Sequence, residues 1–481
     1  MIRASHWIDG RPDCFPGERE IDVASPWNAA VIGRVAAGGD LAVERAVEAA
    51  ARAFRGWRRT PLEDRARRID ALAARVEAER GVLEQLLVAE AGKTLRNARL
   101  EVGNLLAAFR YFRDEAPLRL HGFDLAGDGS FTPRVARDPV GVVAAIAPFN
   151  FPVQLLSWKL CPAVLAGCTV VCKPDPRTPL STARLAEWAS ESGWPEGVFS
   201  VVHGDGATGA RLVGHPGVAK VAFTGSVASG RAVYRSAAER IKRVTLELGG
   251  CSPLVVCQDA DLDRWMDGVL QRAFYNSGQY CFRVNRALVE RSRYDEFLER
   301  FVEAASKLVV GDPADERTDL GPLIDRASRE RVAERIASAE RRGARVCLDG
   351  RTQSSPAGTR IGPTLLADVP SDAEVLHEET FGPVVAAVPF DELDEAVALA
   401  NSTDYGLAAF ALTEDAATGA RLAEELEAGT IWVNALDKSV IELPFGGVKQ
   451  SGIGVEKSQW AFDEYLLTRA VYLGFPGEAP R

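Results

Sequence analysis

The amino-acid sequence predicts an α/β protein built on parallel, doubly wound sheets and divided into two or three domains. First, from residue 141 onward, short apolar runs alternate with helical stretches, as they do in βαβ units. Second, these runs are almost continuously apolar, which is typical of strands covered on both faces. Third, the chain has 481 residues, whereas one domain usually holds roughly 100–200.

The first part of the chain contains both predicted helices and the strands of a first sheet. Residues 40–110 are expected to form amphipathic helices, because apolar side chains recur at three- and four-residue steps, as in Leu62–Val76. The predicted strands that follow are Gly141–Ala147, Thr169–Cys172, Val198–Val202, Lys220–Phe223 and Val244–Glu247. The helices predicted between them are Val153–Ala166, Leu180–Ser192, Ala207–Val213 and Ala228–Arg240.

A second alternating region runs from about Leu254 to Asn434, with Asp349–Gly362 as a surface connection. Its predicted elements include helices Leu262–Phe274 and Tyr294–Leu308 and strands Ala287–Glu290, Val384–Val388 and Leu407–Leu412. Two strand-like segments, Leu118–Arg137 and Glu464–Phe475, fit neither region. Strands of this kind leave unpaired edges, so we expect them to form an interface between subunits.

Composition and charge exclude several classes of function. The net charge is -10, with basic and acidic residues interspersed, so no basic face for nucleic acid is expected. No apolar stretch is long enough to span a bilayer, and the N-terminal residues do not resemble a signal peptide. We therefore expect a cytoplasmic protein whose eight cysteines are free thiols.

Cys281 is the first candidate for chemistry. It follows a predicted helix end and a glycine, in the segment Asn276–Cys281, and a sharp turn there could present its sulfur in a cleft. A buried core cysteine is the commoner explanation for any single cysteine. The functional interpretation therefore depends on neighbouring motifs.

Two polar residues follow predicted parallel strands, where ligands bind in such sheets. The amide of Asn150, in Pro148–Pro152, could donate to an oxyanion, although an ordinary turn explains it equally well. Glu247 ends an apolar strand before two glycines, so partial desolvation would raise its pKa and suit it to accept a proton. A solvated charge at a strand end is the alternative for Glu247.

Two further motifs suit a dinucleotide. Gly225 and Ser226 lie between a strand and a helix N-terminus, which together form an anion site, although a simple helix cap has the same pattern. Lys173 ends another strand and could donate to ribose hydroxyls, or could extend along the surface into solvent.

In this order and spacing, these motifs resemble the aldehyde dehydrogenase superfamily. The segments Glu379–Pro383, Gly429–Asn434 and Pro444–Gly452 match further motifs of that family, and the resemblance extends from about Ile8 to Leu473. It implies a Rossmann-like cofactor domain, an α/β catalytic domain and a small β oligomerisation element. The implied bounds are 1–117 with 138–252, 253–435, and 118–137 with 464–481, while 436–463 returns to the cofactor domain with a substrate-tunnel loop.

The resemblance also implies a mechanism and a set of site residues. Cys281 corresponds to the nucleophile, Asn150 to the oxyanion donor and Glu247 to the base that activates the hydrolytic water. An aldehyde becomes a carboxylic acid through a thioester, and no metal is required. The residues matching cofactor-binding positions are Lys173, Pro174, Phe149, Gly225, Ser226, Glu379 and Phe381. Relatives of this kind are usually homodimers or homotetramers.

Two departures from the family pattern affect what is implied. Pro176 stands where many relatives carry the glutamate that holds the NAD ribose, and Arg177 could attract a 2′-phosphate. Asp175 or the backbone could instead replace the missing glutamate, so NAD and NADP both remain open. Val455 replaces an arginine outside the chemistry.

Substrate identity stays open at this stage. Phe149, Trp158, Tyr280 and Phe282 suggest aromatic walls, and Arg283 or Lys438 could bind an acidic substrate group. For both cations, a surface or interdomain charge is the commoner explanation. Two other functions were considered: an acylating enzyme that passes the thioester to coenzyme A, and a non-catalytic protein on the same scaffold.

Overall fold

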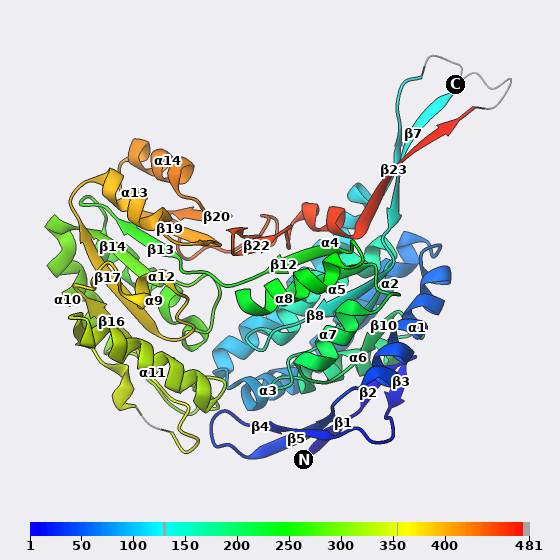
Figure 1. Cartoon of the computed structure of the whole chain (residues 1–481), viewed down its shortest axis with the longest axis horizontal. Coiled ribbons are helices and arrows are strands. Elements are labelled where there is room, and N and C mark those ends of the chain that lie inside the picture. Colours follow the sequence, from blue (N-terminus) through cyan, green and yellow to red (C-terminus); the bar gives the residue numbers. More distant parts are fainter. Residues whose placement is uncertain (128–130, 354, 475–481) are drawn as a thin grey trace.

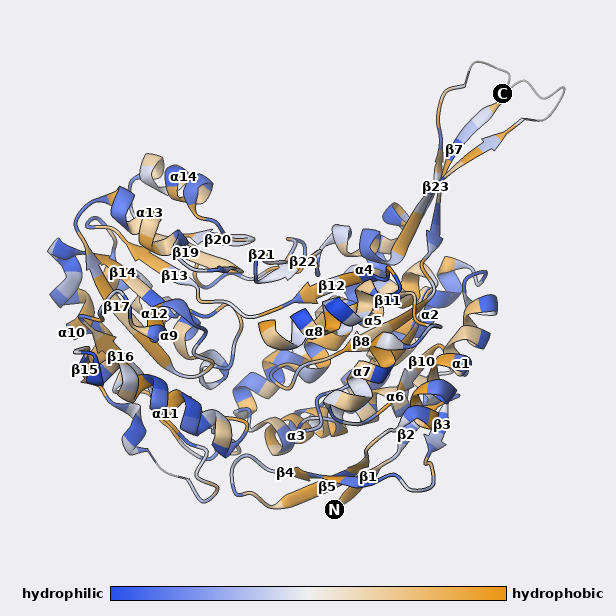
Figure 2. Cartoon of the chain, in the orientation of Figure 1, coloured by the Kyte–Doolittle hydropathy of each residue, from blue (hydrophilic) through white to orange (hydrophobic). Residues whose placement is uncertain are grey.

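The computed structural model describes residues 1–127, 131–353 and 355–474. Two large sheets, each covered by helices, form the body of the molecule, and a narrow β arm projects from it (Figure 1). The central strands of both sheets are predominantly hydrophobic along their length (Figure 2). The predicted α/β class is confirmed.

The first sheet has eight strands in the order β22-β12-β11-β8-β9-β10-β2-β3. Its five central strands are mutually parallel and match the predicted ones to within two residues. They are β8 Val142–Ile146, β9 Thr169–Lys173, β10 Phe199–Val201, β11 Lys220–Thr224 and β12 Arg243–Glu247. The antiparallel edge strands are β2 His6–Ile8, β3 Arg11–Asp13 and β22 Gly452–Ile453, none of which the sequence analysis predicted.

Helices cover both faces of this sheet, as a doubly wound fold requires. Val143 and Ala145 of β8 pack on one side, whereas Val142, Ala144 and Ile146 pack on the other. The helices are α1 Asp40–Trp57, α2 Leu62–Ala78, α3 Arg80–Ala91, α4 Leu95–Arg119, α5 Pro152–Ala166, α6 Leu180–Glu191, α7 Gly206–Gly214 and α8 Val227–Ala238. Helix α5 is apolar on nearly every side because it lies between the sheet and α4.

The second sheet has seven strands in the order β15-β16-β17-β14-β13-β19-β20, of which only β15 is antiparallel to its neighbour. The strands are β13 Pro253–Val256, β14 Arg286–Glu290, β15 Arg345–Leu348, β16 Thr364–Ala367, β17 Val384–Phe390, β19 Ala408–Leu412 and β20 Thr430–Val433. The helices are α9 Leu262–Phe274, α10 Tyr294–Ala305, α11 Arg326–Arg341, α12 Glu374–His377, α13 Leu393–Asn401 and α14 Ala416–Glu425. The elements predicted for this region are all present.

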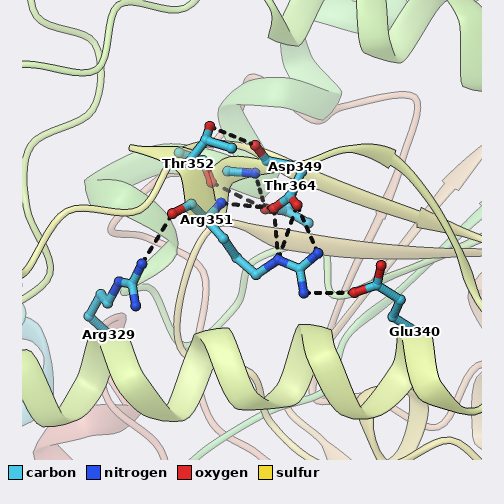
Figure 3. Close-up of polar contacts among 8 residues, drawn as sticks. Arg329, Glu340, Asp349, Arg351, Thr352 and Thr364 are labelled. Atoms are coloured by element: carbon cyan, nitrogen blue, oxygen red, sulfur yellow. Dashed lines mark hydrogen bonds and ion pairs between the residues drawn. The ribbon is translucent and has the colours of Figure 1, made fainter. Parts of the chain in front are cut away.

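The connection after β15 is fastened to its neighbours by arginines (Figure 3). Arg351 pairs with Asp349 at 2.7 Å and with Glu340 of α11 at 2.8 Å, while Arg329 of α11 donates to the Arg351 carbonyl at 3.1 Å. Thr364 of β16 accepts from the Gly350 amide at 3.0 Å. These contacts fix α11, which carries part of the cavity described below.

The projecting arm is the three-stranded sheet β23-β7-β6, made of β6 Phe123–Asp124, β7 Thr132–Pro139 and β23 Leu466–Leu473. Strand β23 pairs with β7 over its whole length, from Leu466 opposite Pro139 to Leu473 opposite Thr132. The predicted first segment began too early, because α4 continues through Arg119. The parts of the two predicted segments at 128–130 and 475–481 lie outside the described residues.

Helices α11, α12, α13 and α14 were not predicted individually, and the other elements that the sequence analysis missed are mostly short strands. A small sheet joins β1 Ile2–Ala4, β4 Glu20–Ala24 and β5 Val31–Ala36, and β18 Tyr405–Gly406 pairs with β21 Val448–Lys449. Strands this short carry too few residues to establish a period. Among the described residues, no helix is both long and apolar enough to cross a membrane.

Candidate functional site

A cavity of about 840 Å³ lies at the carboxyl ends of β8, β9 and β11. Its wall on the side of the first sheet includes Lys173, Asn150 and Gly225, and its opposite wall includes Phe381 and residues of α11. Cys281 also lines this cavity. A parallel sheet binds ligands beyond the carboxyl ends of its strands, and a cavity of this size suits a small-molecule ligand or cofactor.

Cys281 reaches the cavity through a left-handed turn. Helix α9 ends at Phe274, and the next turn, Tyr275–Gly278, has φ of 52° at Asn276, 58° at Ser277 and 73° at Gly278. A Cβ at Gly278 would lie 2.2 Å from the carbonyl carbon of Gly382, so only glycine fits. Non-glycine residues at positive φ are strained and persist only where their surroundings hold them.

A buried polar network holds this turn in place. Lys93 Nζ donates to Asn276 Oδ1 at 3.0 Å and pairs with Glu101 at 3.1 Å, both side chains being fully buried. Asn276 Nδ2 donates to the Asn150 carbonyl at 3.2 Å, and Asn150 Nδ2 donates to the Gln279 carbonyl at 3.2 Å. The sequence analysis missed Lys93, Glu101 and Asn276, because a lysine and a glutamate on helical segments resemble solvated charges.

Glu247 ends β12 with its side chain buried at 3% exposure. Neither carboxyl oxygen has a hydrogen-bond partner among the described residues. Burial, and then the charge of Glu456, raise the pKa of Glu247 well above its usual range, while Lys159 opposes the shift. Lys159 Nζ itself contacts Glu456 at 2.5 Å. Both carboxyl oxygens are enclosed, and Glu247 is not among the residues that line the cavity, although Leu248 and Gly249 directly after it are.

The thiol of Cys281 is partly exposed and lies in a negative environment. Burial raises its pKa above the usual range, and the carboxylates of Glu379 and Glu247 raise it further. Burial also raises the pKa of Glu379 to about 7. The resting thiol is therefore protonated at neutral pH, and nucleophilic attack requires a nearby group to accept its proton.

The residues of the cavity fit a dinucleotide. Lys173 is 6% exposed, and its ammonium group forms no hydrogen bond or ion pair within the described part of the chain. Gly225 and Ser226 precede α8, and Ser226 Oγ caps it by accepting from the Ser229 amide at 3.2 Å. A free buried cation beside a helix N-terminus suits the phosphates and ribose of such a cofactor.

The remaining predicted cofactor residues, except Pro174, also line the cavity. Glu379 accepts from the Gly250 amide at 3.2 Å, and a Cβ on Gly249 would collide with Glu379 Oε2 at 2.3 Å. Phe381 and Phe149 meet edge to face, with ring centres 5.8 Å apart. Pro174 does not line the cavity, although the residues on either side of it do.

Arg177 is held by two carboxylates. It donates to Asp175 at 2.9 Å and to Asp325 at 2.8 Å, and its guanidinium stacks 4.2 Å above the Phe149 ring. These contacts neutralise the charge that we expected to attract a 2′-phosphate, but they leave Arg177 on the cavity wall beside Pro176.

Helix α11 contributes a wall that the sequence analysis did not identify. Ser328, Arg331, Val332 and Arg335 recur at three- and four-residue steps and therefore share one face of the helix. Arg331 donates to Ser328 Oγ at 2.8 Å. The periodicity was visible in the sequence, but a solvated arginine-rich helix face has the same pattern.

Three of the four aromatic residues expected beside the substrate, Trp158, Tyr280 and Phe282, form one buried cluster, whereas Phe149 lies on the cavity wall against Phe381 and Arg177. The ring centres of this cluster lie 4.0 Å apart for Tyr280 and Phe282, 4.9 Å for Phe282 and Phe445, and 5.9 Å for Phe445 and Trp158. Trp432 stacks on Phe282 at 5.6 Å. We call these five residues the aromatic cluster. Phe445 and Trp432 belong to motifs noted in the sequence, but we had not predicted their place here.

The two cations expected to bind an acidic substrate group have other partners. Arg283 is 1% exposed, and each of its three guanidinium nitrogens donates to a backbone carbonyl, those of Thr380, Val284 and Val384. It thereby braces the loop that follows Cys281. Lys438 is mostly exposed and pairs with Asp437 at 2.5 Å. This geometry gives no support to an anion-binding role for either residue.

Comparison with known proteins decides the family. The sequence pattern of the aldehyde dehydrogenase family matches residues 15–471. The chain belongs to this family. Betaine aldehyde dehydrogenase 1 of Rhizobium meliloti (strain 1021) is 39% identical over 484 residues, covering 99% of each chain.

Solved structures agree with this aldehyde dehydrogenase fold. An NAD-dependent aldehyde dehydrogenase from Sinorhizobium meliloti has a TM-score of 0.96 and 36% identity, covering 99% of this chain and 96% of that one. An NADP-dependent enzyme from E. coli has a TM-score of 0.96 and 37% identity, covering 98% of each. The protein is therefore a hydrolytic aldehyde dehydrogenase. It oxidises aldehydes with NAD or NADP as cofactor and uses water to release the carboxylic acid. The comparisons favour neither the coenzyme A-dependent nor the non-catalytic alternative.

The electrostatics of the thiol lead to a testable expectation. Replacing Glu379 by Gln removes a negative charge beside Cys281 and should lower the pKa of the thiol. Alkylation of Cys281 by iodoacetamide in the cofactor-free enzyme at pH 8 should then be about three- to tenfold faster. The exposed neighbour Glu378 is the control, since Glu378→Gln should leave the pH profile of alkylation unchanged. Identical profiles for all three proteins would contradict this account of the thiol.

Proposed function

We propose that aldehyde oxidation in this enzyme is carried out by Cys281 as nucleophile, Asn150 as oxyanion donor and Glu247 as general base. The observation that carries the proposal is the linked turn at Asn276–Gly278. It brings the Cys281 loop against the Asn150 amide. Glu247 lies close enough for its charge to act on the thiol.

In the first half of the reaction, the Cys281 thiolate attacks the aldehyde carbon and the carbonyl electrons move to oxygen. The proton of the thiol passes to Glu247, which releases it to solvent before the second half of the reaction. Asn150 Nδ2 carries two hydrogens, and only one is used by the Gln279 carbonyl among the described residues, so the other can donate to the oxyanion. The backbone N–H of Cys281 is the second donor. The nicotinamide, when bound, accepts the hydride that leaves the tetrahedral carbon.

In the second half, Glu247 takes a proton from water, and the resulting hydroxide attacks the thioester on Cys281. The carbon–sulfur bond breaks, the acid leaves, and the thiolate is restored. Because burial raises the pKa of both Glu247 and Cys281, both groups lose protons as pH rises. Turnover is therefore expected to increase from neutral to alkaline pH.

We further propose that Lys173, Gly225, Ser226, Glu379 and Phe381 bind the cofactor. Lys173 is placed to donate to ribose hydroxyls, the N-terminus of α8 to receive the pyrophosphate, and Glu379 to accept from the nicotinamide ribose. Phe381 with Phe149 offers an apolar edge to the nicotinamide. Arg331 and Arg335 of α11 line the same cavity.

The β arm is proposed to join subunits into a homodimer or homotetramer. Its outer strands β6 and β23 each have a free edge in the described part of the chain, and the arm exposes Phe123, Leu125 and Tyr472 to solvent. Free strand edges beside exposed apolar side chains favour association. The eight unpaired cysteines agree with a reducing compartment, and we propose the cytoplasm.

The base is tested by Glu247→Gln. This variant should form the thioester and stop there, giving a burst of about one reduced nicotinamide per site while the steady rate falls roughly 100-fold or more. Stopped-flow absorbance at 340 nm measures both phases. Cys281→Ser should lose the burst as well, yet still bind cofactor as followed by fluorescence. A normal steady rate for Glu247→Gln would mean that another group activates the water.

Cofactor preference is tested at Arg177. Arg177→Gln leaves Asp175 and Asp325 without their cation, so a cofactor carrying an additional phosphate should be repelled. We expect the KM for NADP to rise about tenfold or more and the KM for NAD less than about threefold. Arg184→Gln, which removes an arginine paired with Glu187 on α6, is the control. Equal changes for both cofactors would show that Arg177 does not discriminate between them.

Assembly is tested on the arm. The double variant Phe123→Lys with Tyr472→Lys places charge on its exposed apolar side chains and should shift the oligomer to monomer in light scattering. The mass of the unaltered protein distinguishes dimer from tetramer. Leu41→Lys, at an exposed position on α1, is the control and should keep the original mass. An unchanged mass for the double variant would place the interface elsewhere.

A further inference from the structure

Lys457 is a buried cation that the proposed mechanism does not use. It lies just after β22, is 7% exposed, and forms no hydrogen bond or ion pair within residues 1–127, 131–353 and 355–474. Its backbone has φ of 60°, a conformation that a long side chain rarely adopts. Burial of an unpaired ammonium on a strained backbone costs stability, and such features concentrate where ligands bind.

The ammonium of Lys457 faces the aromatic cluster. Its Nζ lies 5.6 Å from the ring centre of Trp158 and 6.0 Å from that of Phe445. Phe445 in turn contacts Phe282, which directly follows Cys281 in the chain. The lysine therefore lies at the far side of the cluster whose near side flanks the nucleophile.

The other charged groups near the cluster are either hydrogen-bonded to the protein or exposed to solvent. Arg272 stacks 4.9 Å from Trp432, and its guanidinium donates to the carbonyls of Leu436 and Lys438, both at 2.6 Å. Glu442, the acidic neighbour of Lys457, is exposed and does not contact it within ion-pair distance. Lys457 is thus the cation beside this cluster whose N–H groups have no acceptor among the described residues.

The charge state of Lys457 suits an anionic ligand. Burial lowers its pKa to about 8, with Arg272 acting in the same direction and Glu442 in the opposite one. The ammonium remains mostly protonated at pH 7, and a bound anion would raise its pKa again. Three donors with no acceptor in place can bind a carboxylate directly.

We propose that Lys457 binds an anionic group on the aldehyde, so that the preferred substrates carry a carboxylate at the end remote from the aldehyde carbon. The proposal rests on the assignment of Cys281 as nucleophile. The carboxylate lies against the ammonium, the body of the substrate lies along the aromatic cluster, and the carbonyl reaches Cys281.

A cationic group on the substrate would be disfavoured at this position. The faces of Trp158 and Phe445, which attract cations through their ring electrons, are already occupied by Lys457. A trimethylammonium group placed there would be repelled by a buried like charge. The relative from Rhizobium meliloti is called a betaine aldehyde dehydrogenase, but this chain is expected to disfavour that charge type.

Three aldehydes of similar shape test the preference: 4-formylbenzoate, 4-formylbenzamide and 4-(trimethylammonio)benzaldehyde. With the intact enzyme, kcat/KM should be at least about tenfold higher for the benzoate than for the trimethylammonium compound, with the benzamide between them. Unsubstituted benzaldehyde reports the Cys281 chemistry independently. Oxidation of benzaldehyde with the trimethylammonium compound preferred over the benzoate would overturn the proposal and leave the role of Cys281 intact.

Variants separate binding from packing. Lys457→Gln should raise the KM for 4-formylbenzoate about tenfold or more with kcat little changed, and alter the benzamide less than about threefold. Lys457→Arg should retain the preference. Lys307→Gln, at an exposed lysine paired with Glu303, controls for net charge. Equal losses for the benzoate and the benzamide would make Lys457 a structural residue. If Lys457→Gln does not fold, the Lys457→Arg variant and the ranking of the three aldehydes still test whether Lys457 binds the carboxylate.

Discussion

The site depends on one constraint, the left-handed turn at Asn276–Gly278. Three consecutive residues with positive φ cannot persist without support. The support comes from the Lys93–Asn276 hydrogen bond and from the close approach of Gly278 to Gly382. Because Asn276 also bonds the Asn150 carbonyl, the same network sets the loop of the nucleophile against the proposed oxyanion donor. The contacts that hold the strained turn therefore also fix the position of the Cys281 loop relative to Asn150.

Burial and neighbouring charge raise the pKa values of the proposed reacting groups. Glu247 lacks a hydrogen-bond partner among the described residues, and the thiol of Cys281 lies beside two carboxyl groups, so burial and neighbouring negative charge raise the pKa of both groups. Such an arrangement is costly for folding, since a buried polar group without a partner loses its hydration. It keeps the sulfur unreactive at rest, and reaction begins only when a proton can leave. Lys159 next to Glu247 pairs with Glu456 rather than with Glu247, which leaves the Glu247 carboxyl without a partner among the described residues.

The cavity is shared by two sheets that are far apart in sequence. The first sheet supplies strand ends and the N-terminus of α8, and the second part of the chain supplies α11, Glu379 and Cys281. The aromatic cluster includes Tyr280 and Phe282, the chain neighbours of Cys281, lies outside the cavity lining and extends to Lys457. The proposed cofactor and substrate groups therefore contact different sets of residues around Cys281.

The sequence by itself determined the α/β class, most central strands and helices, and the motifs around Cys281, Glu247 and Asn150. Local periodicity and strand-end polar residues carry that information within a few positions of the chain. Only the tertiary structure decided which charges are free. Arg283 and Lys457 look alike in sequence, yet backbone carbonyls saturate the first and leave the second without a partner in the described chain. One partner of Lys93 and one of Arg177, Asn276 and Asp325, lie more than 100 residues away, and no local pattern encodes a contact that folding alone creates.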